Sequence, residues 1–242
     1  MSFKDGIVPD PECGIWGIYD GHLGAGVAIM VKQEMVNIFE QIYKEGEWKD
    51  KPQLTEEFFK QVFLTVNDLA DTSNIPEAGA CVSIVVVRSE DHKKICYTAN
   101  VGDSSVYILN KTNEDSSKLS YDHHTWDEEE VKRLEDMGTE CYCMGDNELW
   151  VEGMINVTWT IGDYSLKKYG VSCDPHVSRT EITENHPFII VASDGLWDKI
   201  NSRKAYDIVT ESENAGDAAE KLLKKALELK TRDNTAIFVI KF

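Results

Sequence analysis

The order in which apolar segments follow one another along the chain is the feature that most constrains its fold. Two segments with helical periodicity follow one short strand, and strands rich in Val, Ile and Tyr occupy the middle of the chain. Two further helical segments lie between the last two apolar strands. Strands and helices do not alternate as they do in a doubly wound parallel sheet. This order predicts an α+β fold built from layers of helix and sheet.

The individual elements are predicted from periodicity and from helix-capping residues. We expect strands at residues 14–19, 80–87, 95–109, 188–192 and 235–240, and helices at residues 27–43, 56–69, 128–138 and 215–229, with one more after Ser202. Thr55 is a typical N-cap residue, and Thr125-Trp126-Asp127-Glu128 has the pattern of a capping box. Trp16 and Trp197 accompany apolar strands, so we expect both indole rings to pack in the core.

The length and the charge of the chain exclude several classes of protein. A chain of 242 residues can bury one core, so we expect residues 1–242 to form a single domain. Because 43 acidic residues stand against 25 basic ones, the formal net charge is −18, and this charge repels nucleic acids and anionic lipids. No apolar run approaches the length that spans a bilayer. We therefore expect no nucleic-acid partner and no membrane insertion.

The six cysteines indicate the redox environment of the protein. They are scattered without a CxxC pair or a recurring spacing: Cys13, Cys81, Cys96, Cys141, Cys143 and Cys173. This pattern argues against both a disulfide framework and a zinc site. It predicts reduced thiols and a cytoplasmic, intracellular location.

Four apolar strands end in, or begin just after, an aspartate beside a small residue. The segments are Tyr19-Asp20-Gly21-His22, Val101-Gly102-Asp103, Ser193-Asp194-Gly195 and Arg232-Asp233-Asn234. Strand ends from distant parts of a chain can meet at one rim, where clustered carboxylates repel one another unless cations lie among them. Magnesium and manganese suit such all-oxygen sites. Each motif alone is also typical of an ordinary turn.

Taken together, these segments resemble successive motifs of the protein phosphatase 2C family. The matching segments occur in the family's order: Gly17-Ile18-Tyr19-Asp20-Gly21-His22, Ala99-Asn100-Val101-Gly102-Asp103-Ser104, Ile190-Val191-Ala192-Ser193-Asp194-Gly195-Leu196-Trp197-Asp198 and Thr231-Arg232-Asp233-Asn234. The resemblance covers roughly Ile15 to Phe242. It implies a β-sandwich of two antiparallel sheets flanked by helix pairs, with a binuclear metal centre at one end.

The resemblance also implies the ligands of that binuclear centre. At the matching positions, Asp20 would bridge two metal ions and the backbone carbonyl of Gly21 would bind one of them. Asp194 and Asp233 would hold the other ion. Paired Mg²⁺ or Mn²⁺ ions lower the pKa of a bridging water and stabilise charge on phosphoryl oxygens.

Further positions match a third metal site and a proton donor. Asp103 and Asp198, together with Asp194, match a third and more weakly held ion. His22 matches a proposed general acid for the leaving oxygen, although a lone histidine can also simply satisfy a turn. Asp163, in the weaker motif Ile161-Gly162-Asp163, is either functional or a loop cap.

The arginines of the family pattern are missing from this sequence. Members normally carry an Arg…Met-Glu-Asp segment before the Asp-Gly-His motif, and its arginine binds the substrate phosphate. No arginine precedes Asp20 here, Thr158-Trp159 replaces a serine-arginine pair, and Ser105 replaces an arginine. Because arginine binds phosphate through a bidentate fork, these changes weaken phosphate binding more than metal binding.

Two functional interpretations remain open from the sequence. One is a divergent enzyme that uses two or three Mg²⁺ or Mn²⁺ ions to hydrolyse phosphoserine and phosphothreonine in phosphoprotein substrates. It could be the catalytic part of a longer modular protein with an upstream repeat or regulatory module. The other is a weak or inactive pseudophosphatase that serves as a scaffold. The retained aspartates favour the enzyme and the lost arginines favour the scaffold, while the net charge disfavours a metal-dependent nuclease.

Overall fold

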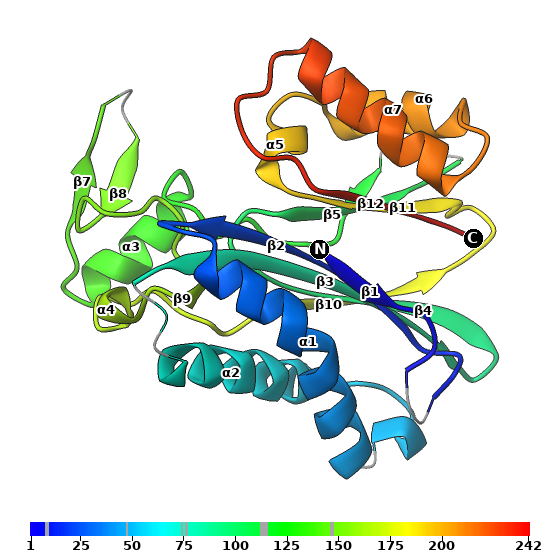
Figure 1. Ribbon diagram of the computed structural model, residues 1–242, viewed down its shortest axis with the longest axis horizontal. Coiled ribbons are helices and arrows are strands. Elements are labelled where there is room, and N and C mark those ends of the chain that lie inside the picture. Colours follow the sequence, from blue (N-terminus) through cyan, green and yellow to red (C-terminus); the bar gives the residue numbers. More distant parts are fainter. Residues whose placement is uncertain (8–9, 47, 74, 76, 112–115, 146–147) are drawn as a thin grey trace.

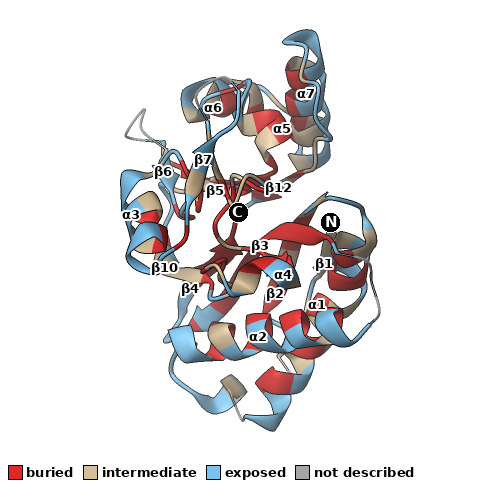
Figure 2. Cartoon of the chain, turned by 90° about the vertical axis from the view of Figure 1, so that its left-hand side faces the viewer, coloured by how far each residue is buried: buried red, intermediate tan, exposed pale blue. Residues whose placement is uncertain are grey.

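Two antiparallel β-sheets lie face to face in the computed structural model, and helices cover the outer face of each sheet (Figure 1). The structure describes residues 1–7, 10–46, 48–73, 75, 77–111, 116–145 and 148–242. Burial follows these layers, since the strands between the helix pairs are mostly buried and the helices are exposed on their outer sides (Figure 2). The observed architecture is the predicted α+β fold.

The first sheet contains the longest strands. Its order is β1 (Ser2–Lys4), β2 (Gly14–His22), β3 (Gly79–Glu90), β4 (Lys93–Val101) and β10 (His176–Ile182), and the short β9 (Ile161–Gly162) pairs with the start of β3. All of these pairs are antiparallel. The register places Asp20 opposite Cys81 and His22 opposite Gly79. The carboxyl end of β2 therefore meets the amino end of β3.

The second sheet is smaller and a hairpin stands apart from both sheets. The second sheet has the order β12 (Ile237–Lys241), β11 (Phe188–Ala192), β5 (Ser105–Leu109) and β6 (Ser117–Lys118). The hairpin consists of β7 (Cys141–Cys143) and β8 (Leu149–Val151). In Figure 1 it lies at the left edge of the molecule, beside α3 (Glu128–Asp136) and near α4 (Tyr164–Lys167).

Each sheet is covered by its own helix pair. Two long helices, α1 (Gly26–Glu45) and α2 (Glu56–Thr72), cover the first sheet, and a 3-10 turn, η1 (Trp48–Asp50), lies between them. Helices α6 (Ser202–Thr210) and α7 (Ala215–Glu228), with the single turn α5 (Asp194–Trp197), cover the second sheet. Thr55 caps α2 as predicted, because its side chain accepts a hydrogen bond from the Phe58 amide.

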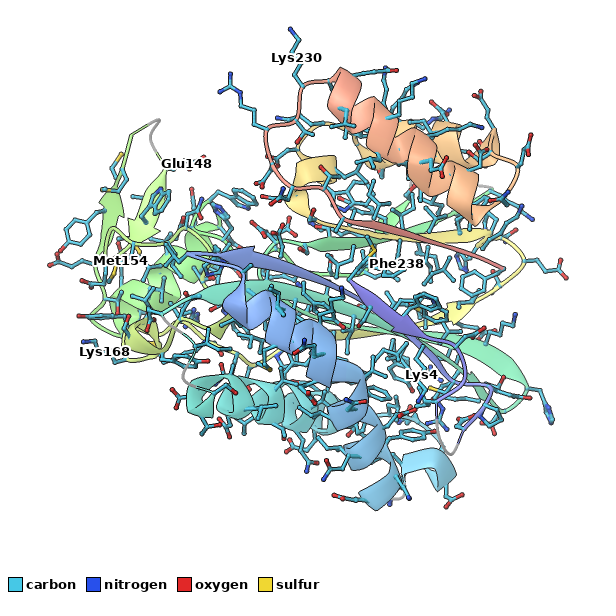
Figure 3. The ribbon with its side chains drawn as sticks, in the orientation of Figure 1. Lys4, Glu148, Met154, Lys168, Lys230 and Phe238 are labelled. Atoms are coloured by element: carbon cyan, nitrogen blue, oxygen red, sulfur yellow. The ribbon has the colours of Figure 1, made fainter. Side chains whose placement is uncertain are left out.

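Apolar side chains hold these layers together. Phe39 of α1 meets Phe58 of α2 edge to face, with 5.0 Å between the ring centroids, inside a core that continues onto the first sheet. A separate cluster between the two sheets includes Ile18, Val106 and Ile189, and Trp16 packs against it. Phe238 of β12 also packs against this cluster (Figure 3). Trp197 packs on Tyr107 at 4.5 Å, so both tryptophans contact the core as expected.

The prediction of one continuous strand over residues 95–109 is wrong. The segment breaks after Val101, and its two halves belong to different sheets, β4 in the first and β5 in the second. Gly102 makes the break possible because its φ is +86° and a Cβ at this position would lie 2.3 Å from the Cys81 sulfur. The break projects Asp103 from the rim of the sandwich.

The predicted capping box at residues 125–128 is also wrong. The side chain that caps α3 belongs to Asp127, which accepts from the Glu129 amide. The Thr125 hydroxyl instead donates to the backbone carbonyls of Leu149 and Asn156. Thr125 therefore fastens the β8 region to the start of α3.

Candidate active site

An acidic pocket of about 310 Å³ lies where strand ends from both sheets meet. Its acidic lining residues come from four distant parts of the chain: Asp20, Asp103, Asp194 and Asp233. Gly21 and His22 line the same pocket. The predicted convergence of strand-end aspartates on one rim is therefore observed for these residues.

The local backbone explains how each aspartate reaches the pocket. Asp20 stands near the end of β2, and Gly21 after it is needed because a Cβ there would lie 2.9 Å from the Ala28 Cβ at the start of α1. Asp103 follows the break between β4 and β5. Asp194 begins α5 directly after β11, and Asp233 lies in the loop before β12. Each carboxylate thus lies at or beside the end of a strand.

The carboxylates disturb one another's ionisation. Burial, followed by the negative charges of Asp233 and Asp103, raises the pKa of Asp20 to about 6. Burial, followed by the charges of Asp103 and Asp20, raises the pKa of Asp194 to about 8. The pKa of Asp103 is raised as well, mainly by burial. Without a cation, the pair Asp20 and Asp194 shares a side-chain hydrogen bond and therefore a proton.

Among the described residues, His22 is the basic side chain that lines the pocket, and its charge partly offsets the rise in the pKa of Asp20 and of Asp103 that burial causes. Within the described part of the chain, no lysine or arginine lines the pocket or forms an ion pair with its four aspartates. One oxygen of Asp194, Oδ1, is buried without a hydrogen-bond partner. A buried acceptor without a partner is costly, so the site favours a cation or a proton at this point.

All but one of the predicted metal ligands line the pocket. Asp20, Gly21, Asp103, Asp194 and Asp233 all line the pocket. Asp198, at the end of α5, is exposed and does not line the pocket, although its charge contributes to the raised pKa of Asp194. Among the residues that the structure describes, no three His, Cys, Asp or Glu side chains have the spacing of a preformed metal cage.

His22 connects the pocket to a buried aspartate. Its Nε2 lies 2.7 Å from Oδ2 of Asp163, and the Asp163 side chain has no solvent exposure. Sequence reasoning left Asp163 open between a functional residue and a loop cap. Although Asp163 is the N-cap residue of α4, its side chain makes no capping hydrogen bond. Its carboxylate is directed to His22 instead.

Part of the pocket wall is apolar and was missed by sequence reasoning. Trp150, Met154, Ile155 and Val157 line the pocket, and they follow or belong to β8. Figure 3 shows Met154 on the side of the molecule that carries the β7–β8 hairpin. These residues carry no motif, and only their position after a short strand distinguishes them. Cys81 also lines the pocket, and its thiol forms a hydrogen bond with Asp103.

Arg179 lies away from the pocket, at the opposite end of β3. Arg179 forms an ion pair with Glu90 at 2.7 Å and also donates to Tyr97. Glu90 is the last residue of β3, nine residues beyond Cys81, or about 30 Å at the rise of an extended strand. Lys32 is an exposed residue of α1 and does not line the pocket either.

Comparison with known proteins bears on both the fold and the sequence. The sequence matches the Protein phosphatase 2C family over residues 9–235. Protein phosphatase 2C homolog 1 of Saccharomyces cerevisiae is 29% identical over 95% of this chain and 82% of its own length. Probable protein phosphatase 2C 44 of Oryza sativa subsp. japonica is 31% identical over 96% of this chain and 69% of its own length. A probable protein phosphatase of Dictyostelium discoideum is 31% identical, but this chain spans only 23% of it.

Solved structures share the same architecture. A serine-threonine phosphatase 2C from Toxoplasma gondii has a TM-score of 0.82 at 19% identity, covering 98% of this chain and 87% of that one. A sex-determining protein of C. elegans has a TM-score of 0.83 at 20% identity, covering 95% of this chain and 56% of that one. Fold and acidic pocket together thus define a protein of the phosphatase 2C architecture. The family match over most of the chain goes further, and the chain belongs to the protein phosphatase 2C family, whose members are protein phosphatases.

No helix in the described part of the chain combines the length and the apolar character needed to cross a membrane. All six cysteines are free thiols.

Proposed function

We propose that residues 1–242 form one catalytic domain that hydrolyses phosphoserine and phosphothreonine in proteins and depends on Mg²⁺ or Mn²⁺. The observation that carries this proposal is the acidic pocket, in which the pKa of Asp194 is raised to about 8 and which no described lysine or arginine lines. Such a pocket would repel a phosphate ester. Bound divalent cations reverse the sign of the local charge and make phosphate binding favourable.

Four pocket residues would hold two metal ions. Asp20 would contact both ions, the Gly21 carbonyl would bind one, and Asp194 and Asp233 would bind the other. The unpartnered Oδ1 of Asp194 fits this role, since a cation would satisfy it. Asp103 and Asp198 would contribute to a third, weaker ion. When bound, the ions supply an activated water and stabilise charge on the phosphoryl oxygens.

The chain's own side chains would orient the substrate and deliver a proton. His22 lines the pocket beside Asp20 and is proposed to protonate the leaving serine or threonine oxygen. Trp150 and Met154, which also line the pocket, would contact apolar parts of the phosphoprotein. A serine phosphate flanked by apolar side chains fits this mixed acidic and apolar lining.

The alternative function is a pseudophosphatase that binds phosphoproteins or regulatory partners without turnover. The observation in its favour is that no lysine or arginine lines the pocket among the described residues, so the phosphate has no side-chain anchor there. Activity measurements separate the two functions directly.

The proposed function is tested by hydrolysis of p-nitrophenyl phosphate and of a phosphothreonine peptide with Mn²⁺, with Mg²⁺ and with EDTA. We expect turnover with either ion and none with EDTA. Asp194→Ala should abolish it, whereas Asp207→Ala, which removes an exposed carboxylate on α6, should leave it unchanged. Metal binding without turnover of either substrate would favour the pseudophosphatase instead.

A further inference from the structure

We propose that Asp163 is a positioning residue that fixes the tautomer and orientation of His22, so that His22 Nδ1 delivers the proton to the leaving oxygen of the substrate. This inference rests on the proposed function and extends it to a residue outside the acidic pocket. The contact joins residues 141 positions apart, His22 Nε2 and Asp163 Oδ2, at 2.7 Å.

The surroundings of Asp163 argue against a purely structural role. The side chain is completely buried, yet only Oδ2 has a partner, and Oδ1 is buried without a hydrogen bond. The residue has a φ of +49°, a left-handed conformation that is unfavourable for a residue with a Cβ. It also leaves the first turn of α4 without a side-chain cap. A loop cap would require none of these costly features.

The sheet is built to bring the two side chains together. Across the ends of three strands, His22 of β2 lies opposite Gly79 of β3, and Gly79 lies opposite Gly162 of β9. A Cβ on Gly79 would lie 2.0 Å from Asp163 Oδ2 and 2.3 Å from His22 Nε2, so the pair occupies the space that this glycine leaves free. The Asn67 side chain of α2 accepts from the Gly162 amide and holds this strand end in place.

The hydrogen bond determines which ring nitrogen of His22 faces the substrate. A carboxylate only accepts, so Nε2 carries a hydrogen and donates to Asp163. Nδ1 is then the ring nitrogen available to the pocket that His22 lines. In the hydrolysis, water oxygen forms the new bond to phosphorus and the ester P–O bond breaks. The hydrogens of the water stay with the product phosphate. Before the step the ring carries a hydrogen on each nitrogen. The electron pair of the broken bond goes to the ester oxygen, which takes the hydrogen from Nδ1, and the neutral ring keeps its Nε2 hydrogen and donates it to Asp163 in the hydrogen bond.

This role predicts a dependence on the leaving group. A nitrophenolate leaves without a proton, whereas a serine alkoxide needs one. We expect Asp163→Asn to lower kcat on a phosphoserine peptide by about 10- to 100-fold and kcat on p-nitrophenyl phosphate by less than about threefold, with KM unchanged for both, since proton donation contributes about 10²–10⁴-fold. Glu77→Gln is the matched control, because it makes the same change of carboxylate to amide beside α4, where Glu77 accepts from the Ser165 amide. Glu77→Gln should leave kcat unchanged on both substrates.

A second variant separates positioning from general damage to the fold. In the His22→Ala background, adding Asp163→Asn should change kcat on the peptide by less than about twofold, because the residue acts only through the histidine. Equal losses on the two substrates, or a further large loss in the His22→Ala background, would overturn the proposal. A melting temperature for Asp163→Asn close to that of the wild type is expected, since the substitution keeps the shape and removes a buried charge.

An NMR measurement on the wild-type protein keeps the two proposals distinguishable. Nitrogen-15 chemical shifts of the His22 ring should show the Nε2–H tautomer when the ring is neutral. An Nδ1–H tautomer would contradict the role of Asp163 whatever the activity. If the wild type hydrolyses neither substrate but shows the Nε2–H tautomer, the proposed function fails and the positioning by Asp163 stands.

Discussion

Acidic groups lie at both ends of strand β3, but their surroundings differ. At one end, Glu90 is 6% exposed and receives hydrogen bonds from the Tyr97 hydroxyl and from Arg179, with Arg88 also within ion-pair distance. At the other end, Cys81 of β3 lies opposite Asp20, in the pocket that no described lysine or arginine lines. A buried acid with arginine partners stabilises a fold, whereas clustered acids without such partners are available to a cation.

The difference also explains where the arginines of this chain are used. Arg88 and Arg179 belong to the Glu90 end, about 30 Å from the pocket at the rise of an extended strand. Arg88 and Arg179 therefore serve the first sheet, and neither lines the pocket. Removal of the Glu90 carboxylate should therefore lower the free energy of unfolding, whereas removal of a pocket carboxylate should weaken metal binding.

The largest expected effect is a loss of stability when the Glu90 carboxylate is removed. Glu90→Ala leaves the buried Arg88 without its carboxylate, so the free energy of unfolding should fall by about 3–5 kcal/mol. Urea unfolding followed by circular dichroism measures this. Glu181→Ala, which removes an exposed partner of Lys93, is the control and should cost less than about 1 kcal/mol. Similar losses in the two variants would mean that the Glu90 cluster is not the compensated site described here.

The next effect concerns phosphate binding at the acidic end. Since no described lysine or arginine lines the pocket, the bound metals are expected to hold the phosphoryl group. Loss of one charge-assisted bidentate contact costs about 1.5–3 kcal/mol, or about one to two decades in kcat/KM. Steady-state kinetics on aryl phosphates should show a high KM and weak inhibition by free phosphate. A micromolar KM with tight phosphate inhibition would show that some basic group does reach the site.

A smaller effect distinguishes the pocket residues from one another. Asp103→Ala should lower turnover by about tenfold, or about 1.4 kcal/mol in activation free energy, while the first two metal ions remain bound. Calorimetric titration with Mn²⁺ gives the stoichiometry alongside the kinetics. Asp20→Ala should remove metal binding and activity together. Unchanged turnover and unchanged stoichiometry in the Asp103 variant would reduce Gly102-Asp103 to a turn.

The last effect is a dependence of the free energy of unfolding on pH. In the folded protein the pKa of Asp194 is about 8, whereas an unfolded aspartate titrates near 4. The folded state therefore holds the extra proton, and its stability falls as the pH rises through 8. Buried His123 and His124 have a pKa lowered to about 4, so their opposite contribution ends near pH 6.5.

Melting temperatures measured in EDTA between pH 6.5 and 8 test this dependence. The melting temperature of the wild type should fall across this window by more than that of Asp194→Asn, in which the titrating group is absent. Comparison of the two proteins cancels the groups that they share. Parallel curves would show that Asp194 titrates normally.

Residues near strand ends could be predicted from the sequence, and contacts between distant segments could not. The four aspartates that line the pocket stand beside predicted strands, in motifs that resemble those of the family: Asp20, Asp103, Asp194 and Asp233. The pairing of His22 with Asp163 depends on the register of β2, β3 and β9, which no local pattern encodes.

The two wrong predictions have the same physical origin. The run at residues 95–109 is apolar throughout, so periodicity does not show that Gly102 sends its two halves into different sheets. Thr125 has the composition of a cap, but tertiary contacts with the carbonyls of Leu149 and Asn156 use its hydroxyl. In both cases a long-range contact decides between local conformations that the sequence leaves open.

The central claim is that the acidic end of the sandwich binds divalent cations, and thermal unfolding with and without Mn²⁺ at neutral pH tests it most directly. At a free Mn²⁺ concentration 100 times the Kd, binding should add about 2.7 kcal/mol to the free energy of unfolding and raise the melting temperature by roughly 5–10 °C. Asp194→Ala should abolish this gain, and Asp207→Ala should retain it. A wild-type melting temperature that stays unchanged up to millimolar Mn²⁺ would contradict the account.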